Sequence, residues 1–184
     1  ELVRNKYKVN GKYIFICVGT LSKRKNQELL LKVISSINNE NMILWLVGDG
    51  EEKKNLIEKT NDFHISDKVV FMGNRRDVNE LLQAADCFCL PSYGEGFPVS
   101  VLEAQASGLP CLLSTNITRE VAITNRVSYL SLDDRNDWER AFVAVSNSRN
   151  TSRKDCWEEI RDAGYDIEIE STKLANKYRE LYTR

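Results

Sequence analysis

The segment that decides the fold spans residues 90–104 and reads Leu90-Pro91-Ser92-Tyr93-Gly94-Glu95-Gly96-Phe97-Pro98-Val99-Ser100-Val101-Leu102-Glu103-Ala104. The run 87–90 that leads into it is short and apolar, which predicts a central strand covered on both faces. Gly94 and Gly96 then favour a loop that a ligand can approach closely. Pro98 is expected as the first residue of a helix, where a missing N–H costs nothing. The segment therefore predicts a buried strand, a glycine loop and a helix.

The loop also carries groups that predict a ligand. The amides of Val99 and Ser100 would be unpaired donors at a helix start, which favours a phosphate. Glu95 and Glu103 flank this position. Because carboxylates repel a diphosphate, we expect them to accept hydrogen bonds from sugar or ribose hydroxyls. The alternative is a tight turn with one glutamate at the surface and one on the helix, the latter paired with a neighbouring basic side chain.

The rest of the chain alternates between predicted strands and helices. Strands are expected at 13–18, 42–47, 69–72, 87–90, 111–114 and 127–130. Helices are expected at 26–37, 51–60, 77–85 and 98–107, and again from 134 onward, with a final helix at 167–182. Leu56 and Ile57 are expected on the inward side of the second helix. Strands separated by single helices predict a doubly wound, Rossmann-like α/β fold with a parallel sheet and helices on both faces.

Composition narrows the class of protein. With 184 residues, 42% of them hydrophobic, the chain predicts one domain, 1–184, with one substantial core. A formal net charge of −1 gives no reason to expect a nucleic-acid partner. No apolar run approaches the roughly 20 residues that cross a bilayer. Four of the five cysteines fall in apolar runs and are expected to be buried, namely Cys17, Cys87, Cys89 and Cys111.

Two further polar segments are expected at the same edge of the sheet, because the carboxyl ends of parallel strands lie together. The first is the basic loop 23–25, whose cations could neutralise a diphosphate. The second is the turn 73–76, where Asn74 or Arg75 could contact a base or a phosphate. Each also has a plainer interpretation, a solvated connector for the first and an ordinary strand-to-helix turn for the second.

The motifs together resemble one enzyme family. Pro91-Ser92-x-x-Glu95-Gly96-Phe97-Pro98, followed by Leu102-Glu103-Ala104-x-Ala106-x-Gly108-x-Pro110, is similar to the signature of family 4 glycosyltransferases, which are retaining enzymes of the GT-B architecture. The remaining matches occur in the family's order, at Val18-Gly19-x-Leu21 with Lys25-Asn26, at Leu46–Gly50 and at Phe71-x-Gly73. The tail Gly164-Tyr165-Asp166-Ile167 resembles capsular and exopolysaccharide members.

The resemblance assigns roles to individual residues. It implies Glu95 and Lys25 as catalytic residues, with Glu95 on hydroxyls of the donor sugar and Lys25 on the diphosphate. It implies Glu103 on the ribose of the nucleotide. The full donor-binding set that we expect is Gly19, Thr20, Arg24, Asn74, Arg75, Gly96, Phe97, Pro98, Val99, Ser100 and Glu103. Members of the family usually carry arginine where this chain has Thr20, so Arg24 or Lys23 is the candidate replacement.

The resemblance also implies the wider context. The chain would be the C-terminal, donor-binding domain, closed by helices over 134–184, with the N-terminal acceptor domain absent and the isolated domain inactive. We expect a UDP-sugar as donor, a glycan or lipid-linked acceptor, no metal and no other cofactor. A cytoplasmic location is expected, with peripheral association at the inner face of the membrane open. A non-catalytic sugar-nucleotide-binding or scaffold domain is the alternative. A receiver-like signalling domain is disfavoured, because it needs acidic residues where this chain has 23–25 and Gly73.

Overall fold

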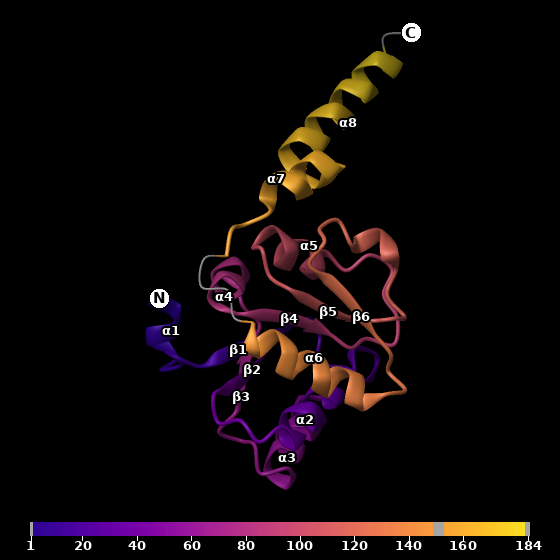
Figure 1. The fold of residues 1–184 in the computed structure, drawn as a ribbon. Helices are drawn as coiled ribbons and strands as arrows, with labels where there is room; N and C mark the ends of the chain where they lie inside the picture. The colour runs from indigo at the N-terminus through magenta and orange to yellow at the C-terminus, as the bar shows by residue number, and fades with distance from the viewer. Residues whose placement is uncertain (1, 149–152, 183–184) are drawn as a thin grey trace.

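A parallel sheet forms the centre of the molecule (Figure 1). The computed structural model describes residues 2–148 and 153–182. In this part of the chain the strands are β1 (Tyr13–Val18), β2 (Met42–Val47), β3 (Val69–Gly73), β4 (Cys87–Leu90), β5 (Cys111–Ser114) and β6 (Val127–Leu130). Their order across the sheet is β3-β2-β1-β4-β5-β6, and every neighbouring pair is parallel. The predicted doubly wound fold is confirmed.

The strand order reverses beside β1. This strand pairs with β2, where Tyr13 aligns with Met42, and with β4, where Phe15 aligns with Cys87. In sheets of this kind the connections leave β1 and β4 on opposite faces, which opens a crevice at their carboxyl ends. The loops that follow β1 and β4 therefore meet at this position.

Helices cover both faces of the sheet in Figure 1. The described helices are α1 (Leu2–Lys6), α2 (Gln27–Ser36), α3 (Lys53–Asp62), α4 (Val78–Ala84), α5 (Val99–Ala106), α6 (Arg135–Asn147), α7 (Trp157–Ile160) and α8 (Ile167–Tyr182). Short turns of other helical types occur at η1 (Lys23–Lys25), η2 (Arg119–Val121) and η3 (Arg161–Tyr165). One face carries α2 between α3 and α6, and the other carries α4 and α5 with α1 and α7.

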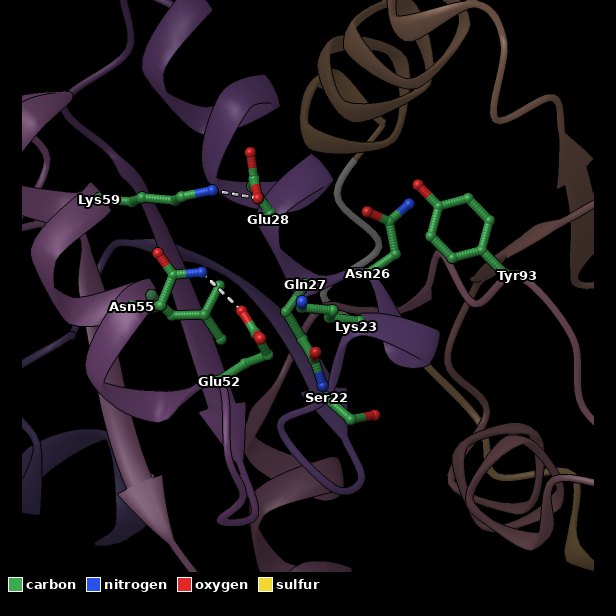
Figure 2. A pocket seen from close by; sticks show the side chains of 10 residues that line it. Ser22, Lys23, Asn26, Gln27, Glu28, Glu52, Asn55, Lys59 and Tyr93 are labelled. Carbon is green, nitrogen blue, oxygen red and sulfur yellow. Dashed lines mark hydrogen bonds and ion pairs between the residues drawn. The ribbon is translucent and has the colours of Figure 1, made fainter.

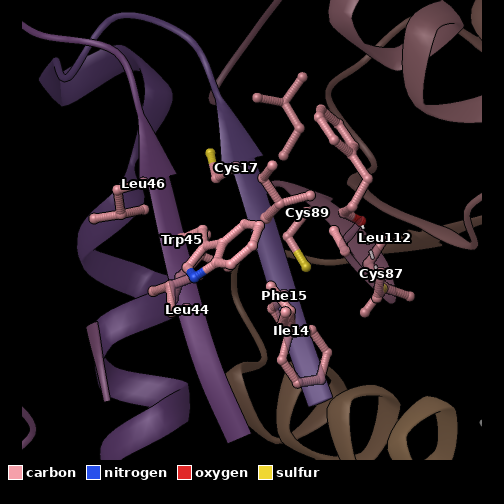
Figure 3. Packing of buried hydrophobic residues seen from close by; sticks show 14 of the residues in the cluster. Ile14, Phe15, Cys17, Leu44, Trp45, Leu46, Cys87, Cys89 and Leu112 are labelled. Carbon is pink, nitrogen blue, oxygen red and sulfur yellow. Dashed lines mark hydrogen bonds between the residues drawn. The ribbon is translucent and has the colours of Figure 1, made fainter. Parts of the chain in front are cut away.

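The core lies between the sheet and these helices, and Figure 3 shows part of it. Trp45 of β2 and Phe15 of β1 are fully buried, and the Phe15 ring stacks on Phe142 of α6 at a centroid distance of 3.9 Å. All five cysteines are buried free thiols, as predicted for the four in apolar runs. Burial raises the pKa of the Cys17 thiol to about 12, so this side chain acts as a small apolar group.

Two local predictions were wrong. Pro98 precedes α5 as its N-cap residue instead of opening it, with an extended backbone at ψ 103°. Its carbonyl accepts from the Val101 N–H at 3.0 Å, as that of an N-cap residue does, so the helix begins one residue later. Ile57 is 40% exposed on the outer side of α3, whereas Leu56 is buried as predicted. The short helix presents only a narrow face to the core, and Ile57 lies outside it.

The C-terminal part of the chain leaves the sheet. At Gly164, inside η3, the backbone takes a left-handed φ of 89°, which kinks the chain before α8 begins. Figure 1 shows α8 extending away from the rest of the molecule, and none of its side chains is buried. Of the helices that the structure describes, none has the length and apolar character to cross a membrane. The predicted closing segment includes residues 149–152, 183 and 184, which lie outside the described residues.

Candidate functional site

The loops after β1 and β4 are tied together through Arg24. The backbone N–H of Tyr93 donates to the carbonyl oxygen of Arg24 at 2.9 Å, and the Ser92 hydroxyl oxygen lies 3.0 Å from the same carbonyl oxygen. The Arg24 guanidinium donates in turn to the carbonyl oxygen of Gly94 at 2.8 Å. The basic loop and the glycine loop, about 70 residues apart in sequence, therefore form one continuous surface.

Glu95 is at the centre of this surface. Its Oε1 accepts from the Lys25 ammonium at 2.8 Å and from the Ser92 hydroxyl at 2.6 Å, and its Oε2 accepts from Arg24 at 3.0 Å. The Glu95 and Lys25 side chains are only 8% and 11% exposed, whereas that of Arg24 is 59% exposed. Since water screens exposed pairs, the Lys25 pair is the stronger one.

The charge state of Glu95 follows from these contacts. Burial acts to raise its pKa, but hydrogen bonds from Lys25 and Ser92, helped by Arg24, hold the pKa below its usual range. The carboxylate is therefore ionised at neutral pH. In this group of three side chains one negative charge faces two positive ones, so Glu95, Lys25 and Arg24 together carry a net charge of +1.

Glycines allow the loops at this edge to pack closely. The aliphatic part of Lys25 lies against Gly19, where a Cβ would be 3.3 Å from the lysine Cε. Gly48 and Gly50, after β2, support the loop after β1 from behind: a Cβ on Gly48 would be 2.1 Å from the Gly19 carbonyl oxygen, and a Cβ on Gly50 would be 2.3 Å from that of Leu21. The position of Lys25 thus depends on two glycines of another loop.

The start of α5 offers amide donors beside the basic loop. As the first residues of an eight-residue helix, Val99 and Ser100 have no acceptor in the preceding turn, and the described residues supply none from elsewhere. Phe97 and Val99 are exposed there, Gly96 is exposed, and Pro98 is buried. This geometry is that of an anion site, and it lies next to the cations of the basic loop.

Glu103 has a different environment from Glu95. Its side chain is exposed, and within the described part of the chain it has no cation or hydrogen-bond donor as partner. The surrounding protein desolvates the carboxyl and raises its pKa above the usual range. A carboxylate without a cation next to an anion site is suited to accept hydrogen bonds from hydroxyl groups.

The turn after β3 lies farther away. In the sheet β3 is separated from β4 by β2 and β1, so Asn74 and Arg75 lie toward one side of the carboxyl edge. Asn74 is exposed, but the Arg75 guanidinium donates to both carboxylate oxygens of Asp77, one of them at 2.8 Å. Thr20 is exposed, and its carbonyl accepts from buried Gln27 at 2.9 Å. The predicted residues therefore fall into a compact group around Glu95 and a separate turn.

Ser92 was not predicted as a site residue. Its buried hydroxyl contacts Glu95 and the Arg24 carbonyl, and its own carbonyl accepts from Ser114 at 2.5 Å. The serine three residues before a glutamate was visible in the sequence, but that pattern usually marks a helix start. Here the pair instead holds a loop in which the glutamate faces two cations.

A cavity of about 390 Å³ lies beside the basic loop, and Figure 2 shows it from close by. It is lined by residues of the loop after β1, Lys23 among them, by residues of α2 and α3, and by Tyr93. Neither the predicted catalytic residues nor the predicted donor-binding set lines it. The Lys59 ammonium and Glu28 carboxylate across it are paired (Figure 2). We therefore place the candidate site at the open surface around Glu95 and α5.

In the described ranges no cluster of three or more His, Cys, Asp or Glu side chains could hold a metal ion.

Comparison with known proteins identifies sequence relatives. The Escherichia coli UDP-Gal:alpha-D-GlcNAc-diphosphoundecaprenol alpha-1,3-galactosyltransferase is 30% identical over 179 residues, covering 92% of this chain and 45% of the relative. A putative glycosyltransferase EpsF of Bacillus subtilis is 32% identical over 165 residues, covering 88% and 43%. The chain thus spans about half the length of the curated relatives that it matches.

Solved structures show the same fold. Anabaena HepE in complex with UDP superposes with a TM-score of 0.82 at 17% identity, over 97% of this chain and 52% of the other. Sucrose-phosphate synthase from Thermosynechococcus elongatus gives a TM-score of 0.83 at 21% identity, over 98% and 48%. The family model described as "Glycosyl transferases group 1" matches residues 1–154, which is most of the sequence. This chain therefore belongs to the glycosyl transferases group 1 family.

Proposed function

We propose that this chain is the C-terminal, donor-binding domain of a retaining GT-B glycosyltransferase of family 4. The complete enzyme would transfer a hexosyl group from a nucleotide-diphosphate sugar, with UDP as the nucleotide, to a glycan or lipid-linked acceptor. One observation carries the proposal: two cations, two unpaired helix-start amides and a cation-free carboxylate gather where the strand order reverses. These are the groups that a diphosphate and a ribose need.

Each group has a proposed task. Lys25 and the amides of Val99 and Ser100 bind the diphosphate and stabilise the negative charge that builds on it as the sugar departs. Glu95 accepts hydrogen bonds from sugar hydroxyls, and Glu103 accepts them from the ribose. In the transfer, the bond between the anomeric carbon and the diphosphate oxygen breaks and a bond to the acceptor oxygen forms. The acceptor proton leaves with the diphosphate, on the same face of the sugar.

The relatives support the acceptor class. The E. coli relative is named for a diphosphoundecaprenol-linked substrate. A Campylobacter jejuni protein that is 36% identical over 129 residues is named as an N,N'-diacetylbacillosaminyl-diphospho-undecaprenol alpha-1,3-N-acetylgalactosaminyltransferase. We propose a similar lipid-linked or polysaccharide acceptor here, bound by an N-terminal domain of the complete enzyme at the inner face of the membrane, with no metal or further cofactor.

A non-catalytic, sugar-nucleotide-binding or scaffold domain is the second candidate. It is favoured by Thr20, because the arginine usual at that position in the family is replaced by an exposed, uncharged side chain. The nearest replacement, Arg24, is already engaged by Glu95 and the Gly94 carbonyl. This candidate predicts weak or absent binding of nucleoside diphosphates and no transfer.

Calorimetric titration of the chain with UDP and GDP tests the proposal. We expect binding of one of them with a Kd between about 1 µM and 1 mM. Glu103→Ala should weaken that binding about tenfold, because the ribose loses its acceptor. In the full-length enzyme Lys25→Ala should mainly slow transfer. Glu58→Gln changes an exposed carboxylate on α3 and serves as the control. Absence of binding to either nucleotide would favour the scaffold domain.

A further inference from the structure

Two of the three cations of the basic loop, Arg24 and Lys25, are already paired with one carboxylate. The Oε1 atom of Glu95 pairs with the Lys25 ammonium at 2.8 Å, and the Oε2 atom pairs with the Arg24 guanidinium at 3.0 Å. The Ser92 hydroxyl fixes the carboxylate in this position at 2.6 Å. The cations that the proposed function assigns to the diphosphate are therefore neutralised in part by a residue assigned to the sugar.

We propose that Glu95 is a specificity-determining residue, an internal anion that competes with nucleoside diphosphate for Lys25 and Arg24. The site would thereby favour the intact nucleotide sugar over the free nucleoside diphosphate that the reaction leaves behind. This inference rests on the proposed function, because it assumes that a nucleoside diphosphate binds at this edge.

The competition follows from the packing around Lys25. Its side chain is 11% exposed and is confined between Gly19 on one side and Glu95 on the other. The ammonium therefore cannot turn far to meet a phosphate without leaving the carboxylate. Loss of the Lys25 pair is costly for the largely buried Glu95 carboxylate, because the remaining pair is with Arg24, whose exposed side chain is screened by water.

The donor sugar changes this balance. When a sugar is attached, its hydroxyls donate hydrogen bonds to Glu95 as Lys25 turns toward the diphosphate, so the carboxylate keeps partners. A free nucleoside diphosphate brings no such hydroxyls and meets a like charge beside the cation that it needs. Once the sugar has been transferred, Glu95 pairs again with Lys25 and Arg24. The affinity of the site for the departing nucleoside diphosphate then falls.

Glu103 provides the contrast within the same site. It is also a carboxylate near the start of α5, but it is exposed and has no cationic partner among the described residues. Neutralising Glu103 removes only an acceptor for the ribose and should weaken nucleotide binding. Neutralising Glu95 should strengthen the binding of free diphosphate. The two substitutions should therefore change nucleotide affinity in opposite directions. A simple loss of contacts would weaken binding in both variants.

The test is calorimetric titration of wild type and Glu95→Gln with whichever of UDP and GDP binds the wild type more tightly. Glutamine keeps the size of the side chain and removes the charge. We expect the Kd of Glu95→Gln to fall about tenfold, the order of effect for removing one like charge at a few ångströms in a partly buried site. Glu58→Gln, the same change on an exposed part of α3, should leave the Kd unchanged.

A second variant locates the effect. In a Lys25→Met background the Glu95→Gln change should tighten binding much less than in wild type, because only the exposed Arg24 is still contested. Glu95→Ala gives the same prediction as Glu95→Gln if the glutamine variant does not fold, and circular dichroism establishes folding for each variant. Equal or weaker diphosphate binding by folded Glu95→Gln and Glu95→Ala would overturn the inference. Failure of the wild type to bind either nucleotide would instead contradict the proposed function.

Discussion

Replacing Gly48 by alanine tests whether the loop after β2 sets the position of the basic loop. Gly48 follows β2 directly and has a φ of +133°, and its N–H donates to the carbonyl of Gly73 at 2.8 Å. A Cβ at this position would be 2.1 Å from the carbonyl oxygen of Gly19 and 2.9 Å from its carbon. These are backbone atoms, so no side-chain rotation can relieve the contact.

The cost can be worked out from this geometry. A Cβ does not approach such an atom within 3.0 Å, so the Gly19 carbonyl must move by about 0.9 Å. Gly19 is itself held by a hydrogen bond from its N–H to the Val47 carbonyl at 2.9 Å. Overpacking typically costs about 1–3 kcal/mol and the strained backbone a further 1–3 kcal/mol. We expect Gly48→Ala to lose roughly 2–6 kcal/mol of unfolding free energy, a large part of the ~5–15 kcal/mol of a typical domain.

Two matched glycines separate the clash from the strain. Gly73 is the bridge partner of Gly48 and has a φ of +66°, but no atom lies within 4 Å of the position that an alanine methyl would take there. Gly73→Ala should therefore cost only backbone strain, about 1–2 kcal/mol. Gly94 has open space and no positive φ, so Gly94→Ala should stay within about 0.5 kcal/mol of wild type.

Urea unfolding followed by circular dichroism measures the three variants, with free energies from linear extrapolation. The expected order of stability is Gly94→Ala, then Gly73→Ala, then Gly48→Ala. If Gly48→Ala is as stable as Gly73→Ala, the two loops do not pack as described. The dependence of Lys25 on the loop after β2 would then be refuted as well.

Two other changes test the supporting structure. Gln105→Leu should lose about 3 kcal/mol in urea unfolding, because fully buried Gln105 accepts from the Thr124 amide at 2.9 Å and leucine leaves such groups unpaired. Hydrogen bonds from Lys32 and Lys59 hold the pKa of Glu28 below its usual value. Glu28 therefore adds stability above its unfolded pKa of about 4.3, which is lost as pH falls through the folded pKa. Glu28→Gln should lower the urea midpoint at pH 7 and not at pH 2.

Each of these changes has a control that alters the same type of side chain at an exposed helix position. Gln83→Leu alters an exposed glutamine of α4 and should leave the unfolding free energy nearly unchanged. Glu58→Gln alters an exposed glutamate of α3 and should leave the pH profile as in wild type. A Gln105 variant as stable as the Gln83 variant would contradict the buried network. A pH-independent loss in Glu28→Gln would assign its effect to packing instead of ionisation.

Local pattern was enough to predict most of the framework. Strands such as β1 and β4 are continuous apolar runs, and the glycines and prolines around them mark their ends, so their positions followed from side-chain chemistry alone. The alternation of strand and helix then predicted the doubly wound sheet. The same local logic failed at Pro98, because the fixed φ of proline suits both the first helical position and an extended residue just before it, and the structure has the latter.

The groups at the carboxyl edge could be identified from the order of residues alone: the glycine loop, the helix start, the two glutamates and the basic loop. Their pairing followed from the packing of the folded chain. Glu95 meets Lys25 and Arg24 because β1 and β4 are neighbours in the sheet, a pairing between segments about 70 residues apart. Arg75 binds Asp77, and Glu103 stays without a cation among the described residues. Strand order and register are collective results of packing, so no local pattern specifies which carboxylate receives which cation.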